Sequence, residues 1–177
     1  MKPNSAASVR EVLTQLKKIT ADIPQLQSRA ADNEKALASL ESAGDLEDKA
    51  TLDEIIRRQA FAALFPRRIA ARENDLQTAE QALQKATDGF ISGELSPRLS
   101  EVSRKIRKEV RIALKPHFSD DFTLDRAVEN SELVQQLDRI GSEIVISSIH
   151  TYGGVVDYAN RKLKALEAVE TMASRAS

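Results

Sequence analysis

The clearest chemical signal in the sequence is a stripe of five basic residues at helical spacing, namely Arg104, Arg107, Lys108, Arg111 and Lys115. On an α-helix these side chains fall within a sector of about 100°. Residues 98–117 contain seven Lys or Arg against two acids. A basic amphipathic helix of this kind can bind the phosphate groups of a nucleic acid or lie on an anionic membrane.

The segment that follows offers the basic stripe a partner within the chain. Residues 119–143 carry seven acids against two arginines, and a short turn separates them from the basic segment. Antiparallel packing of the two segments would place opposite charges along one seam. We therefore favour charge complementarity within the fold or an oligomer over nucleic acid, and nucleic acid over a membrane. No aromatic residue interleaves the stripe to stack on unpaired bases, which weakens the single-strand case.

The two histidines, His117 and His150, are the remaining candidates for chemistry, and neither has a histidine partner three or four residues away. His150 has hydroxyl residues nearby, including Tyr152, so a pocket for nucleophilic catalysis is the enzymatic alternative. No nucleophile elbow, phosphate loop or calcium loop accompanies it. The chain has no cysteine, which removes zinc–thiolate sites and thiol nucleophiles. We expect no enzymatic activity, no metal and no cofactor.

Two further groups have the character of interface residues. Asn33 is the one polar residue in an otherwise apolar helical seam, and such an amide can fix register and oligomeric state. The alternative is that Asn33 lies where the seam is frayed or splayed and has no such role. Phe61, Leu64 and Phe65 lie among five arginines, and Arg and Phe are enriched at protein interfaces. The alternative is that these apolar side chains close the core while the arginines face water.

Long helices are needed to position these residues. Over residues 6–43 the apolar side chains recur every three and four positions, which is typical of a coiled-coil helix about 57 Å long. The phase continues across Pro24, so a single kinked helix is expected. The seam residues are Val9, Val12, Leu16, Ile19, Ile23, Leu26, Ala30, Asn33, Leu37 and Leu40.

A second long helix is expected to fold back on the first as an antiparallel hairpin. Gly44 would end the first helix, and Asp45 or Thr51 would cap the second, with a capping box over residues 51–54. Residues 88–97 form the best loop signal, ending in Ser96 as N-cap and Pro97 as the first helical residue.

Two more helices are expected in the second half of the chain. The first would end at Lys115-Pro116, and its apolar face is Leu99, Val102, Ile106, Val110 and Ala113. The last segment, 124 to about 173, is expected to be helical with a break at Gly153-Gly154. A β-hairpin over 144–156 is the alternative, because this stretch is rich in β-branched residues and Gly-Gly suits a two-residue turn.

The composition supports an all-α fold of long antiparallel helical hairpins, a coiled-coil arm plus a helical bundle. Aromatic residues make up 4% of the chain, and six Gly and five Pro provide few turns. We assign the arm to residues 1–88 and the bundle to 89–177, with one continuous domain as the alternative. Neither a secretory signal nor a membrane span is expected, and the location expected is cytoplasmic.

These features predict a non-enzymatic structural or protein–protein interaction protein, acting in assembly or as a scaffold. A thin core with long seams favours a homo-oligomer, a dimer or a larger assembly, and another protein is a further partner to consider. The alternative is an accessory nucleic-acid-binding protein that uses the basic helix 98–115. The net charge of −1 gives no overall attraction to either kind of partner.

Overall fold

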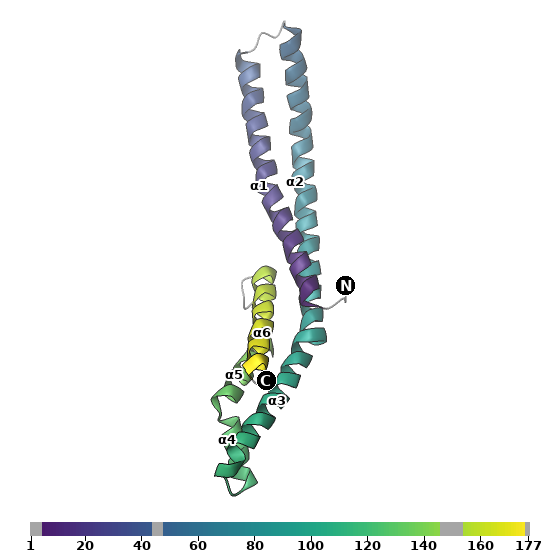
Figure 1. Ribbon diagram of the computed structural model, residues 1–177. Coiled ribbons are helices and arrows are strands. Elements are labelled where there is room, and N and C mark those ends of the chain that lie inside the picture. Colours follow the sequence, from purple (N-terminus) through teal and green to yellow (C-terminus); the bar gives the residue numbers. More distant parts are fainter. Residues whose placement is uncertain (1–4, 44–47, 146–153, 176–177) are drawn as a thin grey trace. The chain divides into compact units, whose positions relative to one another are not determined.

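The computed structural model describes residues 5–43, 48–145 and 154–175 (Figure 1). Every regular element in these ranges is a helix, which confirms the all-α prediction. The chain divides into two compact units. Unit 1 combines Met1–Val12 with Ala82–Ser177, and unit 2 is Leu13–Gln81. The predicted boundary between residues 88 and 89 falls within unit 1.

Helix α1 runs over Ala6–Ala43 and helix α2 over Lys49–Phe90, and their parts in unit 2 form the predicted antiparallel hairpin (Figure 1). Pro24 lies inside α1, so the prediction of one helix across it is confirmed. Pro66 lies inside α2 in the same way. Both prolines are exposed, so carbonyl groups that lose a helical donor there can bond to water instead.

The start of α2 differs from the prediction. Asp48 caps the helix, because its carboxylate accepts hydrogen bonds from the Thr51 amide at 2.9 Å and the Thr51 hydroxyl at 2.8 Å. Thr51 therefore lies in the first turn, and the predicted capping box beginning at Thr51 is wrong. An aspartate is as good an N-cap as a threonine and stands three residues earlier. Gly44 and Asp45 lie outside the described residues.

The loop predicted over residues 88–97 is also wrong. Helix α2 passes into a π-helical turn, η1 (Ile91–Leu95), and then into α3 (Ser96–Leu114). Ser96 has helical angles, φ −66° and ψ −43°, so it is not an N-cap. The side chains of Phe90 and Leu95 are fully buried, and this packing keeps the backbone helical despite the nearby glycines.

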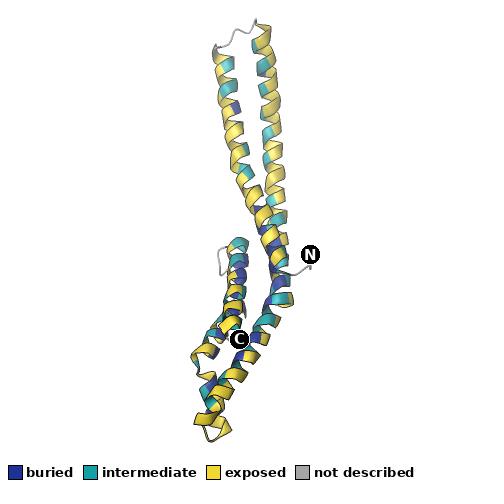
Figure 2. Ribbon diagram, viewed as in Figure 1, coloured by how far each residue is buried: buried dark blue, intermediate teal, exposed yellow. Residues whose placement is uncertain are grey.

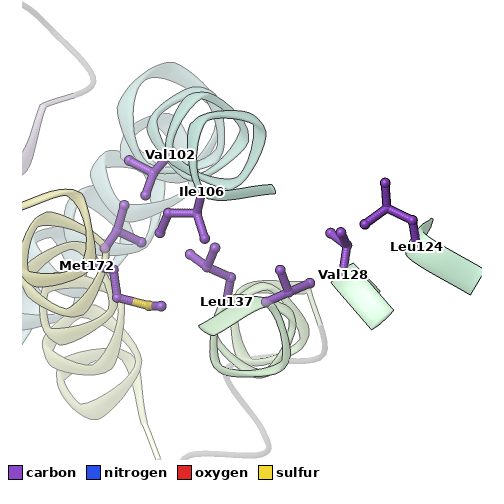
Figure 3. Packing of buried hydrophobic residues seen from close by; sticks show 8 residues of the cluster. Val102, Ile106, Leu124, Val128, Leu137 and Met172 are labelled. Atoms are coloured by element: carbon purple, nitrogen blue, oxygen red, sulfur yellow. The ribbon is translucent and has the colours of Figure 1, made fainter. Parts of the chain in front are cut away.

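The core of unit 1 is built by four helices (Figure 3). It contains Val102 and Ile106 of α3, together with residues of α4 (Asp121–Glu129), α5 (Glu132–Val145) and α6 (Val155–Arg175). Most of the predicted apolar face of α3 is confirmed, but Ala113 is exposed and Leu114 packs on the core in its place. As predicted, α3 ends before Lys115, where the short 3₁₀ turn η2 (Lys115–His117) follows.

The last predicted helix is interrupted earlier than expected. Asn130 and Ser131 separate α4 from α5, and Asp120 caps α4 by accepting the Thr123 amide at 2.8 Å. Gly154 has φ +151°, a conformation that favours glycine, and α6 begins directly after it. The ends of the segment 144–156 are helical. Residues 146–153, on which the helix and hairpin predictions differ, lie outside the described residues.

Candidate functional site

The basic stripe lies on α3 and η2, and two of its members bind acidic side chains of unit 1. Arg107 pairs with Glu129 of α4 and, at 2.8 Å, with Asp138 of α5. Arg111 pairs with Asp125 and, at 3.0 Å, with Asp121. The opposite charges predicted to share a seam therefore do so at these two arginines.

These ion pairs change what the stripe can bind. The hydrogen bond to Glu129 is the largest cause that raises the pKa of Arg107. Because both arginines are about one-third or more exposed, the pairs are expected to add little stability, about 0–1 kcal/mol each. Arg104, Lys108 and Lys115 are exposed and make no ion pair within the described ranges. A polyanion would therefore meet three unneutralised charges.

The predicted patch of Phe61, Leu64 and Phe65 lies on α2 in unit 2. Phe61 and Leu64 are exposed, and Phe65 is half-buried. The two rings lie 6.4 Å apart between centroids, and the Arg57 guanidinium lies 5.7 Å from the Phe61 ring. Such a contact supports an aromatic side chain that remains in water.

The structure adds two large apolar side chains to this exposed region that the sequence analysis does not assign to it. Ile56 is 62% exposed and Leu52 is 41% exposed, close to the 42% of Leu64. At 3.6 residues per turn these three share a face of the helix with two exposed alanines. We call this set the outer face of α2, and it comprises Leu52, Ile56, Ala60, Ala63 and Leu64.

The opposite side of α2 contacts α1 within the hairpin. Ile55 is buried there, and Ala62, Ile69 and Leu76 are half-buried. In Figure 2 most of the hairpin in unit 2 is exposed or intermediate, and buried positions are sparse. The helix therefore has apolar side chains on two sides, and α1 covers one of them.

Asn33 lies in the α1–α2 seam and is 7% exposed. Its Nδ2 donates a hydrogen bond of 2.9 Å to the backbone carbonyl of Arg58. The amide thus links one particular turn of α1 to one turn of α2 within the same chain. Its predicted role in the register of an oligomer stays a prediction.

Lys162 of α6 is a buried cation that the sequence analysis missed, with 1% of its surface exposed. Its Nζ donates hydrogen bonds to the carbonyls of Glu143 at 2.8 Å and Ile144 at 3.0 Å, in the last turn of α5. Burial lowers the pKa of Lys162, and the charge of Glu143 opposes that shift. The ammonium group therefore caps a helix end, a structural role.

A sequence signal for Lys162 existed. Val155, Tyr158, Lys162 and Val169 all fit one helical seam of α6, so a lysine occupies a core position. A lysine at such a position must find acceptors for its ammonium group.

Metal-ligating side chains do not cluster in the described part of the chain. Its residues include no group of three His, Cys, Asp or Glu side chains that could hold a metal ion. His117 is exposed in η2, and His150 and Tyr152 lie outside the described residues. No helix in the described ranges is long and apolar enough to cross a membrane.

Comparison with protein-family models, with curated proteins and with solved structures finds no match. In the part of the chain that the structure describes, the outer face of α2 brings three exposed large apolar side chains together on one helix face, namely Leu52, Ile56 and Leu64.

Proposed function

We propose that this chain is a non-enzymatic structural or protein-interaction protein that works as a homo-oligomer. The observation that carries the proposal is the outer face of α2, where Leu52, Ile56 and Leu64 are exposed together. Single exposed apolar residues are ordinary, but several on one face indicate a surface that another protein covers.

The thin seam of the hairpin supports the same proposal. Among the described residues of unit 2, Leu13, Leu16 and Ile55 are the buried apolar side chains. The apolar seam positions between Leu16 and the tip, such as Ile23 and Leu37, are half-buried. Two helices alone cannot enclose a core, so apolar surface of the hairpin remains open to another chain. Burying that surface would stabilise the complex by about 25 cal/mol per Å².

The test is the mass of the full chain in solution, by light scattering coupled to size exclusion at several concentrations. One chain has a mass of 19.5 kDa, so a dimer gives twice that value. We expect the double variant Ile56→Glu and Leu64→Glu to shift the mass toward that of one chain, with unchanged helix content by circular dichroism. A wild-type protein that stays at 19.5 kDa at all concentrations would refute the proposal.

Ile112 provides a matched control for the same experiment. It lies on α3 and is 61% exposed, nearly as much as Ile56. Ile112→Glu makes an equivalent change on a helix of unit 1, outside the outer face of α2 as defined above. We expect this variant to keep the mass of the wild type.

The nucleic-acid alternative rests on the exposed charges of Arg104, Lys108 and Lys115. About three phosphate contacts would make the binding only moderately salt-dependent, with a slope near −2.7 in log K against log salt. A gel shift at low salt that is lost in Arg104→Glu with Lys108→Glu would support this role. Absence of a shift for the wild type would remove it.

A further inference from the structure

Three of the five residues of the outer face, Ile56, Ala60 and Leu64, are spaced symmetrically about Ala60, whereas Leu52 and Ala63 have arginines at their mirrored positions. Ile56 lies four residues before Ala60 and Leu64 lies four residues after it. Asp53 lies seven residues before it and Arg67 seven residues after it. Seven residues are close to two full turns, so Asp53, Ala60 and Arg67 share one side of α2. An apolar centre is thus flanked by an acid at one end and a base at the other.

The two charges at the ends have no ion-pair partner among the described residues. Asp53 and Arg67 are both exposed, and no salt bridge includes either of them in the part of the chain that the structure describes. Of their neighbours, Glu54 binds Arg57 and Arg58, and Arg72 binds Asp22 and Asp75, whereas Arg68 is exposed and makes no ion pair within the described ranges. Unpaired charge of opposite sign is therefore present at the two symmetric positions 53 and 67.

We infer that the outer face of α2 binds a second copy of this chain, with the two α2 helices antiparallel and a two-fold axis near Ala60. The inference rests on the proposed function, since it specifies the geometry of the homo-oligomer. In an antiparallel pair centred at Ala60, a residue that precedes Ala60 in one copy lies opposite the residue that follows Ala60 by the same number of positions in the other copy. Asp53 of one copy then meets Arg67 of the second copy, twice in the dimer, about 10 Å from the axis.

Two of the apolar side chains, Ile56 and Leu64, match under the same operation, whereas Leu52 lies at the level of Arg68 of the second copy. Ile56 of each copy lies at the level of Leu64 in the other copy, about 6 Å along the helix from the axis. Ala60 faces its own counterpart, and its small side chain allows the helix axes to approach to the short end of the usual 8–10 Å range. A parallel pair in register would instead place Asp53 against Asp53 and Arg67 against Arg67, which is unfavourable.

Single cysteines test this geometry directly, because the full chain has none of its own. In the antiparallel pair Ala60→Cys places two thiols at the axis, within the Cα separation of less than about 7 Å that a disulfide requires. Ala70→Cys lies on the same helix, but its two copies would be twenty residues apart along the axis, about 30 Å. Under mild oxidation we expect a covalent dimer from Ala60→Cys and none from Ala70→Cys.

Charge reversal provides a second, independent readout in the full chain. Asp53→Arg and Arg67→Asp alone should each weaken dimerisation by about tenfold, and the two together should restore most of the affinity. Asp32→Arg is the matched control, because Asp32 is exposed on α1 and makes no ion pair with another described residue. We expect it to leave the dissociation constant within about twofold of the wild-type value.

The outcomes separate this inference from the proposed function. A dimer by light scattering that crosslinks through position 60 and not 70, with rescue by the double reversal, supports both. A dimer that fails to crosslink at position 60, or crosslinks at both positions, overturns the antiparallel geometry and leaves the homo-oligomer standing. A protein that is monomeric at all concentrations overturns both.

Discussion

Replacing Lys162 with methionine removes the ammonium group that caps α5 while keeping a side chain of similar length. The carbonyls of Glu143 and Ile144 then lose a charged donor at 2.8 and 3.0 Å. A buried acceptor left without a partner costs about 1–3 kcal/mol. The Ile144 bond is buried and incurs this cost in full, whereas the Glu143 bond is partly buried and its carbonyl can bind water.

A second effect works in the opposite direction. The methionine side chain avoids the desolvation of a buried charge, the same effect that lowers the pKa of Lys162. Loss of the donor to two carbonyls, one of them partly hydrated, would lower the folding stability by about 2–4 kcal/mol. Removal of the buried charge also removes its desolvation cost, which offsets part of this decrease. We expect the free energy of unfolding of unit 1 to fall by about 2 kcal/mol.

The assay is hydrogen exchange by mass spectrometry on the full chain in increasing urea, read on peptides from α5 and α6. Peptides from residues 13–81 report on unit 2 in the same experiment. Lys164→Met is the control, because Lys164 is exposed on the same helix, and its effect should stay within about 0.5 kcal/mol. If Lys162→Met changes the stability of α5 and α6 no more than Lys164→Met does, the capping argument is wrong.

Three further predictions concern unit 1. Leu137→Ala should lower its unfolding free energy by about 2–5 kcal/mol in urea titrations, because Leu137 is almost fully buried in the four-helix core. Gly141→Ala should raise the free energy of unfolding by up to about 1 kcal/mol, since an added Cβ meets Leu99 at an ordinary 3.4 Å and alanine favours the helix; a lower free energy of unfolding in urea titrations would contradict this. Because burial lowers the pKa of Lys162 in the folded chain, the unfolded chain binds more protons just below pH 10.5, and the unfolding free energy should rise with pH there. Lys162→Met should abolish this rise, which urea titrations across that pH range would measure.

The helices were largely predictable from the sequence because their apolar residues repeat at helical spacing. The phase of the seam carried the prediction of α1 across Pro24, where local propensity alone favours a break. The same reasoning located most of the face of α3 that packs on the core. Periodicity is reliable here because one side of each helix is buried along many turns.

The junction between α2 and α3 was mispredicted because its local signals favour a loop. Gly89, Gly93 and Pro97 all disfavour a continuous helix. The fold overrides them by burying Phe90 and Leu95 and by inserting a π turn, in which the Ser96 amide bonds to the Ile91 carbonyl five residues back. That turn ends two residues before Pro97, where a proline would crowd a carbonyl of a regular α-helix. Such a rearrangement depends on tertiary packing and has no signature in the sequence.

The candidate site was predictable only in part, for a related reason. Phe61 and Leu64 were singled out by residue type, but Ile55 and Ile56 are adjacent and chemically identical. The seven-residue spacing of Ile55 with Ala62, Ile69 and Leu76 predicts that Ile55 faces α1, and the structure buries Ile55 while leaving Ile56 exposed. The same pattern assigns Leu52 to the side of Ile55, but Leu52 is exposed and lies on the outer face, because α2 is apolar on more than one side.

The distribution of buried residues links the stability of unit 2 to its association. Unit 1 has a core to which four helices contribute, whereas unit 2 has a seam that is half-buried along most of its length. Asn33 adds a specific hydrogen bond to Arg58 but little apolar burial, so it fixes the pairing of the hairpin more than it strengthens it. A second copy on the outer face would bind the paired helices and not the unfolded segment, and the hairpin would gain stability by mass action. In the proposed dimer the seam and the outer face of α2 use different apolar side chains, and burial of the outer face would add to the stability that the seam provides.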